Sequence, residues 1–135
     1  MTLEDLEKLK KIASEDLKIT EDNLAKKSLD IPILYHKYLD IFINELKQLK
    51  QLSLDKDKLY GKLYHHYKFE SNYSLDTKNE IEVYVKGNDE YYIKALAYYQ
   101  QEIVVKYLES ILDAFTKMGF NIKNHIEFKK FLAGN

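Results

Sequence analysis

A run of lysines interleaved with aromatic residues occupies the middle of the chain, from Lys56 to Lys68. Lysine neutralises phosphates and releases their counterions, and a tyrosine ring can stack on an exposed base at roughly 1 to 3 kcal/mol each, whatever the base. Such a run suits a sequence-independent contact with single-stranded nucleic acid. The candidate contact residues are Lys56, Lys58, Tyr60, Lys62, Tyr64 and Lys68.

Two of these lysines, Lys58 and Lys62, are four residues apart and share one face of a helix, with the tyrosines positioned to flank it or to be buried beside it. The simpler alternative is that the tyrosines are half-buried packing residues and the lysines a solvated helix face. The residues by themselves leave both interpretations open.

Other reactive groupings are sparse. His65 and His66 are adjacent, so on a helix they point about 100° apart and cannot chelate one metal together. The sequence contains no glycine-rich phosphate loop, no nucleophile elbow and no HExxH motif, and it has no Cys. We therefore expect a non-enzymatic protein without a cofactor or a metal site.

The charge composition favours a sequence-independent contact. The formal net charge is only -1, but six lysines against two acids between Lys47 and Lys68 make a basic zone, and an acidic zone follows from Phe69 to Glu90. All 21 basic residues are Lys. Because Lys lacks the bidentate fork with which Arg reads guanine, sequence-specific recognition is disfavoured.

The expected location is the cytoplasm. The N-terminus is acidic and lacks the apolar run of a signal peptide, and no segment approaches the roughly 18 apolar residues that indicate a membrane span.

Helical periodicity dominates the N-terminal half. Thr2 can cap a first helix that carries Leu3, Leu6, Leu9 and Ile12 on one face. A short second helix, capped by Thr20, is expected to end near Pro32, since the residue before a proline avoids the helical region. Beyond it, apolar residues at steps of three and four predict one long helix over 33–67, either continuous or interrupted at 53–55. A continuous helix would span roughly 50 Å.

The C-terminal half begins with a predicted loop over 71–79. Ile81, Val83 and Val85 alternate with polar residues, which favours a short β element near 80–86 before a turn over 86–89. A second long helix should end at Met118-Gly119, with Gly at the usual terminating position, and a short last helix is expected over 122–132.

The predicted fold is therefore mainly α, in one domain over 1–135. Within it, 1–70 would hold the N-terminal helices and the basic patch, and 90–135 the C-terminal helices. Amphipathic helices of this length have broad apolar faces that one small subunit cannot bury alone, which favours packing between subunits.

The C-terminal sequence resembles a known family. L-D-A at 112–114, G-F-x-I-K at 119–123 and F-x-A-G at 131–134 are similar, in order and without gaps, to the end of UvsY, a family of recombination mediators from T-even-like phages. The opening Met1, Leu3, Glu4, Asp5 and Leu6 and the stretch 34–39 are similar as well. The family's basic K-A-R-L motif falls on 60–63, where only Lys62 and Leu63 match, so Lys58 is the substitute that lies one turn earlier.

The resemblance implies a non-catalytic mediator that binds single-stranded DNA and assembles into rings of six or seven subunits through its C-terminal region. It also implies two protein partners, a RecA-like recombinase and a single-strand-binding protein. It favours the DNA-binding interpretation of the lysine run. The residues expected to mediate assembly are Ile103, Tyr107, Ile111, Leu112, Phe115, Phe120 and Phe131.

A second hypothesis, from a different class, is a helical scaffold that binds only proteins. The near-neutral net charge and the long apolar stripes favour it. Stable assembly without affinity for nucleic acid would distinguish it from the mediator.

Overall fold

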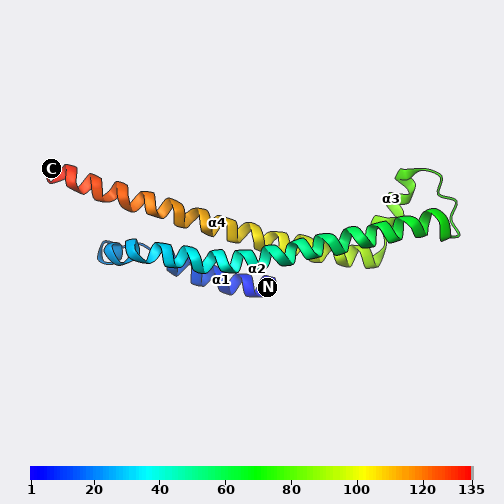
Figure 1. The fold of residues 1–135 in the computed structure, drawn as a ribbon, viewed down its shortest axis with the longest axis horizontal. Helices are drawn as coiled ribbons and strands as arrows, with labels where there is room; N and C mark the ends of the chain where they lie inside the picture. Colours follow the sequence, from blue (N-terminus) through cyan, green and yellow to red (C-terminus); the bar gives the residue numbers. More distant parts are fainter. Residues whose placement is uncertain (135) are drawn as a thin grey trace. The chain divides into compact units, whose positions relative to one another are not determined.

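The computed structural model describes residues 1–134 and is helical, without a strand in that range. The elements are α1 (Leu3–Asp16), a 3₁₀ turn η1 (Glu21–Asn23), α2 (Leu24–His65), a π-helical segment η2 (His66–Glu70), α3 (Lys78–Lys86) and α4 (Asp89–Leu132) (Figure 1). The mainly α fold class is thus confirmed.

The chain divides into two compact units. Unit 1 combines Met1–Glu45 with the chain from Val104 onward, and unit 2 is the continuous stretch Leu46–Ile103. Unit 1 therefore pairs sequence from both ends of the chain, whereas unit 2 consists of neighbours in sequence. The single domain predicted over 1–135 stays a prediction.

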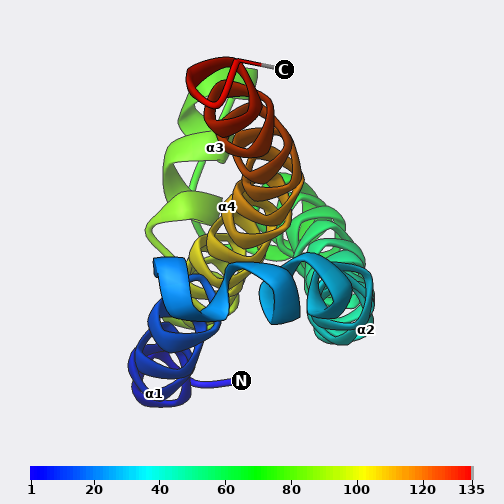
Figure 2. The ribbon, with the colours of Figure 1, turned by 90° about the vertical axis from the view of Figure 1, so that its left-hand side faces the viewer.

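Unit 1 begins with the capped helix that the sequence predicts. The backbone N–H of Asp5 donates to Thr2 Oγ1 at 3.0 Å, and the Asp5 carboxylate accepts from the Thr2 N–H at 2.9 Å. This reciprocal pair satisfies two of the N–H groups that a helix start leaves without partners. Figure 2 shows α1 leading through a short turn into α2.

The core of unit 1 is built from three helices. Residues at steps of three and four on α1 and α4 meet Tyr38 of α2, whose ring lies 5.3 Å from that of Phe115 between centroids. A helix whose apolar residues recur at this spacing buries one continuous stripe. The buried residues are Leu6, Leu9, Ala13, Tyr38, Val104, Leu108, Ile111, Leu112, Phe115, Met118 and Ile122.

Polar contacts fasten the same unit. Asp16, at the end of α1, accepts a hydrogen bond from the Tyr38 hydroxyl at 2.6 Å and pairs with Lys37 Nζ at 3.1 Å. Farther along, Glu21 of η1 pairs with both His125 and Lys129 of α4. These contacts fix the chain between α1 and α2 to the two helices beside it.

The predicted helix end near Pro32 is wrong, because α2 runs from Leu24 to His65 with Pro32 inside it. A proline there removes one hydrogen bond to the carbonyl four residues earlier. Ile31 and Leu34, on either side of Pro32, both pack against the core. The apolar contacts on both sides hold the helix through the missing bond.

The predicted helix end at Met118-Gly119 is also wrong, because α4 continues through Gly119 to Leu132. No separate last helix begins near Ile122. Met118 and Ile122 are both buried on the face that carries Phe115, so the packing stripe continues past the glycine. Gly119 has no positive φ, and a Cβ built there would meet nothing within 4 Å. Gly119 therefore does not end the helix.

The short β element predicted near 80–86 is wrong as well, because this segment is helix α3. Ile81 and Val85, four residues apart, are buried in unit 2, whereas Val83 is 69% exposed. The Thr77 hydroxyl accepts from the Glu80 N–H at 3.2 Å and caps the helix. The Thr-x-x-Glu spacing from Thr77 to Glu80 is typical of a helix start. The alternating apolar residues that follow favour a strand and oppose this signal.

Within residues 1–134, no helix is long and apolar enough to cross a membrane.

Candidate nucleic-acid interface

Four lysines follow one outward face of α2 within unit 2. Lys47, Lys50, Lys58 and Lys62, here called the lysine stripe, are all exposed, and the last three fall on an i, i+4 ladder completed by Leu54. Among the described residues, none of the four has a carboxylate within ion-pair distance. The stripe thus presents unneutralised charge over about 22 Å of helix.

Two other lysines of the predicted set rest on aromatic rings. Lys56 Nζ lies 4.3 Å from the centroid of Tyr98 and 5.8 Å from that of Tyr99. Lys68 Nζ lies 5.2 Å from the ring of Phe69. The quadrupole of an aromatic face attracts a cation at these distances. Lys56 and Lys68 are therefore already partnered, unlike Lys58 and Lys62.

The predicted stacking residues Tyr60 and Tyr64 are half-buried. Their rings lie 6.2 Å apart, and Tyr60 also meets the ring of Tyr91 edge-on at 5.8 Å. Burial, together with the negative charge of Glu82, raises the pKa of Tyr60 above its usual value. The structure thus places both tyrosines in the packing of unit 2.

Exposed aromatic rings lie elsewhere in unit 2. Tyr92 and Tyr99 of α4 are 62% and 58% exposed, while their neighbours Tyr91 and Tyr98 are half-buried. In each tyrosine pair the helical turn of 100° per residue directs one ring inward and the next outward. The sequence shows the pairs but does not indicate which member is exposed.

A shallow polar cleft opens beside the lysine stripe, with a volume of about 290 Å³. Lys58, Lys62 and Asp55 line it from α2, and Glu90 and Lys94 line it from α4. Sequence reasoning missed Lys94. No signal in the sequence marks this residue, because it joins the lysines of α2 only through the packing of one helix on the other.

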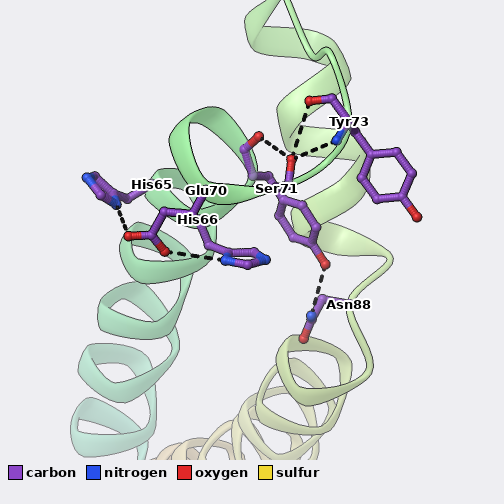
Figure 3. A network of polar contacts seen from close by, with 7 residues as sticks. His65, His66, Glu70, Ser71, Tyr73 and Asn88 are labelled. Carbon is purple, nitrogen blue, oxygen red and sulfur yellow. Dashed lines mark hydrogen bonds and ion pairs between the residues drawn. The ribbon is translucent and has the colours of Figure 1, made fainter.

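A carboxylate joins the two adjacent histidines at the end of α2 (Figure 3). Glu70 Oε1 lies 3.6 Å from His65 Nδ1, and Oε2 lies 3.4 Å from His66 Nδ1. The π-helical turn places residue i+5, as well as i+4, within reach. Nowhere in the described part of the chain do three His, Cys, Asp or Glu side chains gather as metal ligands would.

The same end of unit 2 is closed by hydrogen bonds (Figure 3). The Ser71 hydroxyl donates to the Tyr67 carbonyl at 2.9 Å, and the Asn88 side-chain amide donates to the Tyr67 hydroxyl at 3.1 Å. Asn88 Oδ1 also accepts from the backbone N–H groups of Glu90 and Tyr91, which caps α4. Asn88 thus ties η2, which directly follows α2, to the start of α4.

The residues predicted to mediate assembly fall into two groups. Ile111, Leu112 and Phe115 belong to the core of unit 1, and Tyr107 is half-buried against that core. The exposed members are Ile103, Phe120 and Phe131, the last two with 66% and 75% of their surface accessible. Only this second group has apolar surface free for a neighbouring molecule.

Comparison with known protein families gives a match. The family described as "Recombination, repair and ssDNA binding protein UvsY" matches residues 12–135. No curated protein sequence matches significantly.

Crystal structures of the recombination mediator protein UvsY of bacteriophage T4 are similar to this chain. Lattice type IV has a TM-score of 0.82 at 20% identity, covering 97% of this chain and 98% of the other. Lattice type II has the same score and identity and covers 98% of each chain. Lattice type III has a TM-score of 0.66 at 21% identity, covering 98% and 99%. At this identity the structures show a shared fold, and the family match over most of the chain shows that the protein belongs to the UvsY family.

Proposed function

We propose that this protein is a non-catalytic recombination mediator that binds single-stranded DNA and helps load a RecA-like recombinase onto DNA coated by single-strand-binding protein. The family match supports the recombination role. The observation that supports DNA binding is the lysine stripe, which keeps four charges exposed and unpaired among the described residues.

The contact is with the backbone of the strand rather than with base edges. Lysines supply charge without the planar fork that distinguishes bases, and the chain has no Arg. Of the predicted contact residues, Lys58 and Lys62 are the principal phosphate ligands, since Lys56 and Lys68 already rest on aromatic rings. Tyr60 and Tyr64 would support the surface from within unit 2.

Self-assembly would multiply this contact. A ring of six or seven subunits repeats the stripe along one strand, so that modest contacts add up to high avidity. The exposed Phe120 and Phe131 of α4 are the apolar residues that a neighbouring subunit would cover. Replacing both with Ser should give small species in sedimentation velocity without loss of helicity. Assemblies of unchanged size would place the interface elsewhere.

The test of DNA binding is fluorescence anisotropy of a labelled oligothymidine, titrated with protein at 50 mM and 200 mM salt, with a duplex of equal length as competitor. Tight binding that prefers the single strand and weakens with salt supports the proposal. If the protein assembles but does not bind even at 50 mM salt, the protein-only scaffold is the better account.

A further inference from the structure

The cleft between α2 and α4 in unit 2 gathers charge from two helices. Lys58 and Lys62 reach it from one side and Lys94 from the other, with Asp55 and Glu90 beside them. Positions 58 and 62 are exposed and Lys94 is half-buried, so part of the Lys94 stem packs on the protein. The three lysine side chains therefore line one small volume.

The carboxylates of the cleft form no ion pair with these lysines. Asp55 Oδ1 accepts a hydrogen bond from the Gln51 side-chain amide at 2.9 Å, and neither acid lies within ion-pair distance of a lysine among the described residues. Three cations and two anions line the cleft, which leaves an excess of one positive charge. An incoming anion of one negative charge would balance it.

We propose that this cleft holds one phosphodiester group of the bound strand, with Lys94 as a phosphate ligand that joins Lys58 and Lys62, and with Asp55 and Glu90 limiting the affinity. The proposal rests on the proposed function, because it assumes that a single strand is the ligand. Each lysine donates charge-assisted hydrogen bonds to phosphate oxygens, whereas each carboxylate repels them. The strand would then lie across α2 and α4 instead of along α2 alone.

The carboxylates suit a protein that must release its ligand. A mediator passes the strand to another protein, so binding that is too tight would oppose the transfer. Two fixed negative charges beside the phosphate weaken the complex without removing any lysine contact. The cleft thus combines a specific position for the backbone with a moderate affinity.

The experiment measures oligothymidine affinity by anisotropy for four variants of the full chain. Lys94→Ala removes the ammonium and the stem, and Lys94→Met removes the charge but keeps an apolar stem of similar length. For one phosphate contact with a salt exponent of about 0.7, we expect both variants to bind roughly eightfold more weakly at 50 mM salt and about threefold more weakly at 200 mM. Glu90→Gln should bind roughly threefold more tightly. Lys11→Ala, on an exposed position of α1, is the control and should bind as the wild type does.

The outcomes separate this inference from the proposed function. If the wild type does not bind the single strand, the proposed function itself fails. If the wild type binds and both Lys94 variants bind as tightly as it does, the cleft proposal is overturned, while DNA binding by the lysine stripe is not. Weakening in Lys94→Ala but not in Lys94→Met would also overturn it, since the stem and not the charge would then matter. A weaker Glu90→Gln variant would refute the role of the carboxylates.

Discussion

The contact between Tyr38 and Asp16 in unit 1 allows a stability prediction with a defined magnitude. The Tyr38 side chain is fully buried, and its hydroxyl donates to Asp16 Oδ2 at 2.6 Å. Tyr38→Phe removes this donor and keeps the ring that packs on Phe115. Because hydrogen bonds to charged groups contribute about 1.5 to 3 kcal/mol, we expect the free energy of unfolding to fall by about that amount.

The effect should depend on pH. Burial raises the pKa of Asp16, but hydrogen bonds from Tyr38 and Lys37 and the nearby lysine charges outweigh it, so the pKa lies below the usual 3.8. A group whose pKa is depressed by folding stabilises the folded state above its unfolded pKa, and this stabilisation is lost as the pH falls through the folded value. The difference between wild type and Asp16→Asn should therefore be largest near neutral pH and shrink below about pH 4.

Urea unfolding followed by circular dichroism measures both effects. Tyr35→Phe is the matched control, because it removes a hydroxyl from an exposed tyrosine three residues earlier on α2. The control should change the unfolding free energy by less than about 0.5 kcal/mol. Equal effects of Tyr38→Phe and Tyr35→Phe would refute the reasoning, as would an Asp16→Asn difference that does not vary with pH.

Three further predictions concern other parts of the chain. Lys58→Ala with Lys62→Ala should lower the slope of log affinity against log salt by about 0.7, because both lysines hold the same phosphate, so that the loss between 50 and 200 mM salt is roughly 2.6-fold smaller than in the wild type; an unchanged slope would move the phosphate contact elsewhere. Gly119→Ala should raise the free energy of unfolding in urea by about 0.5 to 1 kcal/mol, because the position is helical and has open space for a methyl group, and a loss of stability would contradict this. Phe115→Ala should cost about 3 to 5 kcal/mol of folding stability, whereas Phe120→Ala should change assembly size in sedimentation more than stability; the reverse pattern would exchange their roles.

The helices that carry a long apolar period were predictable. Local signals, such as the Thr2 capping box and the three- and four-residue spacing of α2, agree there with the tertiary packing. The wrong predictions of helix ends lie where a local signal opposes the tertiary packing. Pro32 and Gly119 usually end helices, but apolar residues on either side of both positions pack against the core and continue the same stripe. An apolar stripe that continues past a proline or glycine is therefore stronger evidence for a continuous helix than that residue is for a helix end.

The lysine run was likewise found from spacing, but the state of each side chain was not. Lys56 and Lys58 are two residues apart, and the structure places one over a tyrosine ring and leaves the other in solvent. Lys94 is separated from Lys62 by 32 positions and meets it only because α4 packs on α2 within unit 2. Contacts of this kind depend on how helices pair, which a single sequence does not specify.

The division of the chain into two units has a consequence for the order of folding. Unit 2 is a continuous stretch, so its two long helices meet by closing the 66–88 segment, whereas unit 1 must bring Met1–Glu45 and the chain from Val104 onward together across all of Leu46–Ile103. Closing a loop of that length costs roughly 3 to 4 kcal/mol of chain entropy when the loop is unstructured. A helical hairpin formed first from unit 2 would shorten the effective loop and remove most of that cost. We therefore expect unit 2 to form early and the two ends of the chain to join last, with the slowest amide protons to gain protection in the core of unit 1.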